Sequence, residues 1–256
     1  LFVFNQSANS LQTLVVPGAV SGAFTSDGFR AYVASNTGRI FVFSPFASLL
    51  TLGPFGTPTS TAPLASNNFV YATGSPSLTS LAVCSDLAAA SPVATSAPQL
   101  VASTNNADQI VAVNATGIDI ATATVTSPAS GICPPGISYT SQFIDFGQGA
   151  FTARQVLVAS NGSRVVVIPA GINKIFTAVP GTPGSTIITL PAGATEALSG
   201  ALTNDGKTLW VGVAGTNTVD KIDLTTGTDV VQVATKFLKA DGTTPAPPNI
   251  IALRPK

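Results

Sequence analysis

Two stretches of the chain follow nearly the same pattern: SGAFTSDGFRAYVASNTGRIFVF at Ser21–Phe43 and SGALTNDGKTLWVGVAGTNTVDKIDL at Ser199–Leu224. Each runs from a Gly-Ala pair to an Asp-Gly pair and then into two β-rich runs separated by a polar break. Asx-Gly pairs are favoured in tight hairpins because they tolerate positive φ. Val, Ile, Thr, Phe and Tyr, which dominate the runs, suit a pleated and half-buried surface. The repetition predicts an all-β fold built from copies of one unit.

Weaker copies of the opening phrase lie between the two strong ones. Openings begin at Gly22, Ser80, Phe143 and Gly200, with spacings of 58, 63 and 57 residues, and three further β-rich runs follow each. Four short strands per unit, repeated with turn residues between them, are typical of a β-propeller of four-stranded antiparallel blades. Helical periodicity is nearly absent. An all-β sandwich pair is the alternative.

The two ends of the chain suggest how the ring closes. Leu1–Gly18 matches the third and fourth strands of a unit, and Pro247–Lys256 matches a first or second strand. Pairing of the N- and C-terminal strands would complete one shared blade and remove exposed sheet edges. We therefore expect one domain over residues 1–256 with five blades. The Pro-, Thr- and Ser-rich segment 45–66 is predicted to be an insertion, and a sixth blade built partly from it is the alternative.

The composition is unusually poor in charge. Eleven basic and eleven acidic residues make 9% of 256 residues, where about 25% is ordinary, and the mean hydropathy is +0.43. A neutral chain with dispersed basic residues argues against nucleic acid as a partner. No run of about 18 apolar residues occurs, so no membrane span is expected. Since few charges weaken repulsion between molecules, we expect a surface of neutral polar residues that is partly covered by neighbouring subunits.

Cys84 and Cys133 are the two cysteines of the chain. In so charge-poor and Thr-rich a sequence we interpret them as an extracellular disulfide. Closing a loop of about 50 residues would stabilise the fold by about 4 kcal/mol in the chain-entropy model. Two buried free thiols are the alternative.

The inventory of catalytic residues is small. The chain has no His, so a Ser-His-Asp or Cys-His arrangement cannot be built, and no phosphate-binding glycine motif occurs. We expect no catalytic residue, no resident metal and no cofactor. A weaker alternative, a metal-dependent hydrolase similar to propeller lactonases, would use Asp145 and Glu196, each expected where a first, channel-lining strand begins. Trp210 is interpreted as a core residue between blades rather than as a sugar-stacking platform.

Three Asn-x-Ser/Thr sequons make Asn5, Asn114 and Asn161 candidate glycosylation sites. All three lie beside predicted turns, from which a glycan would project into solvent.

The repeat resembles the YVTN family of propeller repeats. The closest matches are AYVASNTGRIFVF at Ala31–Phe43 and TLWVGVAGTNTVDKIDLTTGTDVV at Thr208–Val231. The resemblance implies a propeller fold and, because the family occurs in surface-layer and secreted proteins, an extracellular or cell-surface location after removal of a signal peptide. Function has to be argued from sites, since propellers host many functions.

Three functions remain for the structure to test. The first is a non-enzymatic structural propeller that self-assembles, as a homo-oligomer or with envelope partners, into a filament, tube or surface layer. The alternative is a binding module for glycans or peptides, with segment 45–66 as the expected contact loop. The lactonase-like hydrolase is third.

Overall fold

The protein is described here by a computed structural model that covers residues 2–5, 8–44, 47–66, 68–74, 78–89, 97–104, 108–126, 133–226, 229–233 and 237–253. In these ranges all regular secondary structure is β-strand, in 22 strands. None of them contains a helix long and apolar enough to cross a membrane.

The strands form five four-stranded antiparallel sheets and one two-stranded sheet. We call the four-stranded sheets blades I to V and the two-stranded sheet the N-terminal hairpin. The hairpin pairs β1 (Phe2–Asn5) with β2 (Ser10–Thr13). Blade I comprises β3 (Ala19–Phe24), β4 (Ala31–Ser35), β5 (Arg39–Ser44) and β6 (Ala47–Leu52). Blade II comprises β7 (Thr61–Pro63), β8 (Phe69–Ala72), β9 (Thr79–Ala82) and β10 (Leu87–Ala89).

The remaining blades have the same up-and-down order. Blade III comprises β11 (Leu100–Ser103), β12 (Gln109–Val113), β13 (Gly117–Thr126) and β14 (Gly136–Asp145). Blade IV comprises β15 (Ala153–Val158), β16 (Val165–Pro169), β17 (Lys174–Ala178) and β18 (Thr186–Thr189). Blade V comprises β19 (Glu196–Leu202), β20 (Thr208–Ala214), β21 (Thr218–Asp223) and β22 (Asp229–Gln232).

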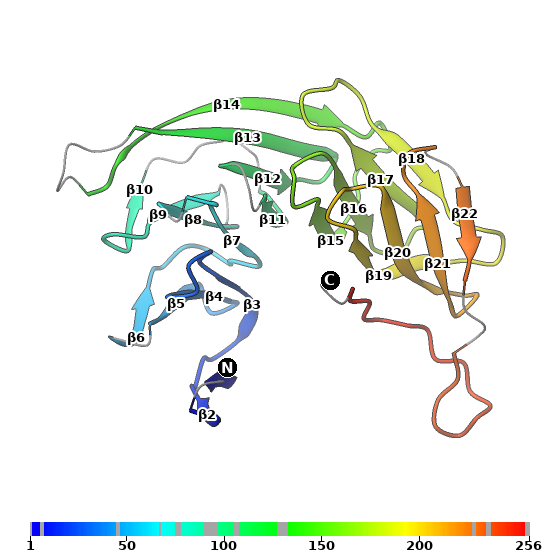
Figure 1. Cartoon of the computed structure of the whole chain (residues 1–256), viewed down its shortest axis with the longest axis horizontal. Coiled ribbons are helices and arrows are strands. Elements are labelled where there is room, and N and C mark those ends of the chain that lie inside the picture. Colours follow the sequence, from blue (N-terminus) through cyan, green and yellow to red (C-terminus); the bar gives the residue numbers. More distant parts are fainter. Residues whose placement is uncertain are drawn as a thin grey trace.

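The blades follow one another around an arc in chain order, with their first strands toward the middle (Figure 1). The first strand of each blade contacts the first strand of the next, from β3 to β7, β11, β15 and β19. This radial arrangement of four-stranded sheets is that of a β-propeller, so the predicted fold class is confirmed.

The hydrophobic core is divided among the interfaces between successive blades. Four buried clusters occur, one each between blades I and II, II and III, III and IV, and IV and V. Strand β16 shows how the sequence produces this: Val165 and Val167 pack toward blade III, and Val166 and Ile168 pack toward blade V. Because side chains alternate along a strand, a strand between two blades must be apolar on both faces. The continuous run VVVI follows from that requirement.

The two strong sequence copies form the same turn. The Thr25 and Thr203 hydroxyls donate to Oδ1 of Asp27 and Asp205, both at 2.6 Å. The same carboxylates accept the amide of the residue two positions on, at 3.0 and 3.1 Å. The glycine between has φ of 72° at Gly28 and 69° at Gly206, a region that a Cβ disfavours. The Asp-Gly pair therefore makes a tight turn from the first strand of a blade to the second, as predicted.

The strand assignment between the two strong copies differs from the prediction. The segment 45–66 is not an insertion between strands of one blade, because it supplies β6 to blade I and β7 to blade II. The stretch around Ser80 is the third strand of blade II rather than a first strand, and Phe143 lies on the fourth strand of blade III. The described residues thus form six sheets, of which five are complete four-stranded blades, so the alternative of a sixth blade was the better prediction.

The predicted pairing of the chain ends is not found. Among the described residues, Phe2–Asn5 pairs only with Ser10–Thr13, and residues 247–253 form no strand. Pro247 and Pro248 lack the amide hydrogen that a strand ladder needs. The carbonyl of Pro248 instead lies against β20, at a place where a Cβ on Gly212 would overlap it. Figure 1 shows the N-terminus at one end of the arc and the C-terminus nearer its middle, so the ring has an open side.

Candidate functional site

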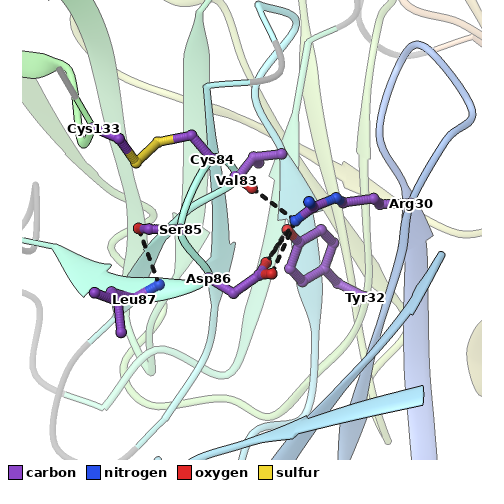
Figure 2. Close-up of a disulfide and its surroundings, with 8 residues drawn as sticks. All are labelled: Arg30, Tyr32, Val83, Cys84, Ser85, Asp86, Leu87 and Cys133. Atoms are coloured by element: carbon purple, nitrogen blue, oxygen red, sulfur yellow. Dashed lines mark hydrogen bonds and ion pairs between the residues drawn. A yellow bond between two sulfur atoms is a disulfide. The ribbon is translucent and has the colours of Figure 1, made fainter. Parts of the chain in front are cut away.

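An ion pair joins blades I and II beside the disulfide. Arg30 Nη1 donates to both carboxylate oxygens of Asp86 at 2.9 Å and to the Val83 carbonyl at 2.7 Å. Burial raises the pKa of the Tyr32 phenol, which therefore stays protonated and donates to Asp86 Oδ1 at 2.8 Å. Figure 2 shows these side chains converging next to the Cys84–Cys133 bond. This cluster holds two blades together and leaves no carboxylate oxygen free for chemistry.

Cys84 and Cys133 are bonded to each other, as the sequence predicted, with Cα atoms 6.1 Å apart. Both cysteines are exposed, so the alternative of buried thiols is wrong. Cys133 lies between β13 and β14, which are ten residues long and extend past their own blade over blade II (Figure 1). At the same overhang, Tyr139 of β14 packs edge-on against Tyr71 of β8. The disulfide therefore fastens this long hairpin to the neighbouring blade.

Three glutamines join successive blades through both ends of the side-chain amide. Gln99 donates to the Phe151 carbonyl at 2.9 Å and accepts the Ala153 amide at 2.7 Å. Gln142 likewise donates to one backbone group of blade IV and accepts from another, and Gln155 does so with the backbone of blade V. These neutral contacts between blades explain in part how the fold is held together with few charges.

The two acidic residues of the hydrolase hypothesis do not form a site. Glu196 is on the innermost strand of blade V, as expected, but its carboxylate accepts Arg154 Nη2 at 2.6 Å and the Gly171 amide at 2.7 Å. Asp145 ends β14, the outermost strand of blade III, and its Oδ1 accepts the Gly147 amide at 2.6 Å. The expectation that Asp145 begins a channel-lining strand is wrong. Within the described ranges, no three Cys, Asp or Glu side chains gather as a metal site.

Trp210 is not a core residue between blades. Its neighbours Leu209 and Val211 belong to the cluster between blades IV and V, so by strand alternation Trp210 lies on the opposite face of blade V. It is half-buried, with Lys221 Nζ 6.0 Å from its ring centroid. On blade V, Asp220 is 1% exposed and accepts the Thr218 hydroxyl at 2.8 Å.

The three sequons differ in their surroundings. Asn161 is exposed in the turn after β15, where its Oδ1 accepts the Ser163 amide. Asn114 is half-buried, and its Nδ2 donates to Asp119 Oδ2 at 3.2 Å, a bond that a glycan on that nitrogen would disturb. The sequon at Asn5 runs into residues 6–7, which lie outside the described part of the chain.

Exposed apolar side chains are concentrated in the two terminal segments of the described chain. Of the seventeen large hydrophobic side chains that are exposed among the described residues, twelve fall in residues 2–24 and 231–253. The first group is Phe2, Phe4, Leu11, Val15, Val20 and Phe24; the second is Val231, Val233, Phe237, Leu238, Ile250 and Leu253. We call these two groups together the open-side surface. No charged residue occurs in 2–24. This surface was not predicted from the sequence, because the N- and C-terminal strands were expected to pair with each other.

Comparisons with known proteins identify the fold and give no information on function. No family model matches the chain, and no curated protein matches it. Among solved structures, the chain is similar to the β-propeller domain of Cps50 (Swd1) from Myceliophteria thermophila, with a TM-score of 0.59 and 9% identity. The alignment covers 83% of this chain and 67% of that one. At this identity the likeness supports a propeller fold alone.

Proposed function

We propose that this protein is a non-enzymatic structural propeller of the extracellular space or cell surface that assembles with copies of itself through its open-side surface. The observation that carries the proposal is the concentration of exposed apolar side chains in the two terminal segments of the chain, with Phe2 73%, Leu11 63% and Ile250 81% exposed. Large exposed apolar patches on soluble proteins mark interaction sites.

The absence of charged residues from segment 2–24 supports another copy of this chain as the partner. Burying a charged group in an interface carries a desolvation cost, and the segment 2–24 has no charged residue to desolvate. The N-terminal hairpin has two strands where each blade has four, and an isolated two-stranded hairpin is marginally stable in water. Contact with another copy would stabilise it.

The exposed disulfide supports the location. Disulfides persist in oxidising compartments and are rare in a reducing cytosol, and the Cys84–Cys133 bond is accessible to solvent. The ordinary structural contacts made by Glu196, Asp145 and Asp86 favour a scaffold over the hydrolase alternative.

Sedimentation velocity over a wide range of concentrations, with negative-stain electron microscopy, tests the proposal. Wild-type protein should associate as its concentration rises, and Leu11→Ser should shift it toward monomer. Leu87→Ser is the matched control, because Leu87 is 65% exposed but lies on β10, away from the open side. A wild-type protein that stays monomeric at every concentration, or an equal effect of the two substitutions, would contradict the proposal.

A further inference from the structure

A groove lies between blade III and two loops of blade IV. It is lined by Gln109, Ile120, Thr122, Thr140, Ser141, Gln142, Gly162, Pro180 and Gly181, and its volume is about 450 Å³. Small-molecule sites in proteins span roughly 300–1,000 Å³. The groove is therefore large enough for a small organic ligand.

The floor of the groove is ordered by strand pairing. Gln109 pairs with Thr122, and Thr122 pairs with Thr140, so the three side chains form one polar row across β12, β13 and β14. Ile120 and Gln142 form the next row, two residues along the same face. Amide and hydroxyl groups are thus presented at the regular spacing of a sheet.

The walls are held by hydrogen bonds to other parts of the molecule. Gln142 donates to the Thr182 carbonyl at 3.1 Å and accepts the Gly181 amide at 2.9 Å. On the other side, the Ser160 and Ser163 hydroxyls donate to backbone carbonyls of blade V, both at 3.2 Å. A ligand would therefore meet a preformed groove and would not have to order its loops.

The chemistry of the lining is neutral and polar. None of the nine lining residues is charged. Within the part of the chain that the structure describes, the exposed hydroxyl of Thr140 has no hydrogen-bond partner, and the Gln109 amide makes only a long 3.4 Å contact with Thr122. Hydroxyls donate and accept, as does a side-chain amide. An ionic ligand would find no counter-charge here, whereas a neutral polyol would find partners for its hydroxyls.

We propose that this groove binds a neutral saccharide, whose hydroxyl groups exchange hydrogen bonds with Gln109, Thr122 and Thr140 while Pro180 contacts the C–H face of a sugar ring. The proposal is independent of self-assembly, since the groove is formed by blades III and IV and not by the open-side surface. A peptide fits less well, because a common mode of peptide recognition adds a strand to a sheet edge, whereas this floor is the face of β12, β13 and β14, which are paired with one another.

Saturation-transfer difference NMR on the intact chain tests the proposal with three neutral probes, maltotriose, cellotriose and tri-N-acetylchitotriose, and with trialanine as the peptide probe. We expect saturation transfer to at least one saccharide and none to trialanine. Absence of transfer to all three saccharides, or equal transfer to the peptide, would overturn the assignment.

A double substitution locates the binding. Thr122→Val with Thr140→Val keeps the side-chain shape, removes two hydroxyls and favours a strand, so the fold should persist. Losing hydrogen bonds to the sugar should weaken binding about tenfold or more. Thr124→Val, at an exposed position of β13 outside the groove, is the matched control and should bind as wild type does. Unchanged affinity in the double variant, or equal loss in the control, would refute the site.

Discussion

The side-chain amide of Gln155 makes two hydrogen bonds with the backbone of Gly200: Nε2 donates to the carbonyl at 3.2 Å, and Oε1 accepts the amide at 2.8 Å. Gln155 is on the first strand of blade IV and Gly200 is on the first strand of blade V. The side chain therefore pairs with the neighbouring blade as another peptide group would. Gln99 and Gln142 repeat the arrangement from blade III to blade IV.

Gln155→Glu should destabilise the protein although it changes only one group of the side chain. A carboxylate can still accept the Gly200 amide but cannot donate to the Gly200 carbonyl, which is left facing negative charge. A disrupted buried hydrogen bond costs about 1–3 kcal/mol, and urea unfolding should show a loss of that size. The control is Gln148→Glu, because Gln148 is exposed and its Oε1 already accepts Lys174 Nζ. Equal stability of the two variants would refute the role given to Gln155.

Much of the propeller could be predicted because its turns and strands are determined by residues close together in the sequence. The Thr-x-Asp-Gly turn is encoded within four residues, so the strong copies at Thr25 and Thr203 were placed correctly. The structure shows a third version in blade IV, where Asn161 Oδ1 accepts the Ser163 amide and the Gly162 amide donates to the Ala159 carbonyl. That turn was predicted, but not as the first turn of a blade, because Ala159 stands where the strong copies have Thr. The opening was instead assigned to Phe143, one strand too early.

The remaining features depend on distant parts of the chain. A Gln that joins two blades reads in the sequence as any surface Gln, since its partners are backbone groups about 40 to 50 residues away. The burial of Asp220 could not be predicted from the strand TVDKID, because its two apolar residues are three positions apart and so mark neither face as buried. The disulfide could be predicted because a chain with two cysteines allows one pairing.

Asp86→Asn should weaken the contact between blades I and II. The Asp86 carboxylate accepts Arg30 through both oxygens and also the Tyr32 hydroxyl, and an amide in its place retains one acceptor and loses the charge. Hydrogen bonds to charged groups contribute about 1.5–3 kcal/mol, so thermal unfolding should show a loss in that range.

Asp27→Asn is the control for this change. Asp27 accepts the Thr25 hydroxyl and the Phe29 amide through Oδ1 alone, and Asn161 shows that an amide oxygen fills an equivalent place. Its effect on thermal unfolding should be much smaller than that of Asp86→Asn. An Asp86→Asn variant no less stable than Asp27→Asn would contradict the argument.

Removing the disulfide should lower the free energy of unfolding by about 4 kcal/mol, which is the chain-entropy value for its sequence separation of 49 residues. The double variant Cys84→Ser with Cys133→Ser should also raise amide hydrogen exchange in β13 and β14, because it releases the end of that hairpin from blade II. Exchange in blade V, which does not contact the hairpin, serves as the internal reference. Unchanged exchange in β13 and β14 relative to blade V would show that the hairpin is held by other contacts.

Asp220→Asn should stabilise the protein at neutral pH. Asp220 is 1% exposed, and burial raises the pKa of its carboxyl above the ordinary value of 3.8. In the described part of the chain it forms no ion pair that would offset the loss of hydration. An uncharged Asn can still accept the Thr218 hydroxyl. We expect a gain of roughly 1–2 kcal/mol in the free energy of unfolding at pH 7.

The sign of the pH dependence distinguishes this account from a general effect of the substitution. Because the raised pKa lets the folded protein hold a proton on Asp220 that the unfolded chain releases, the contribution of Asp220 to stability falls as pH rises from about 3.8 through the folded pKa. The advantage of Asp220→Asn should therefore shrink as pH falls toward 4. Asp223→Asn should behave oppositely, since the Thr225 hydroxyl and amide hold the pKa of Asp223 below its ordinary value. Urea unfolding of both variants at pH 4 and pH 7 measures the difference, and an Asp220→Asn advantage that is the same at both pH values would show that burial of the charge is not its cause.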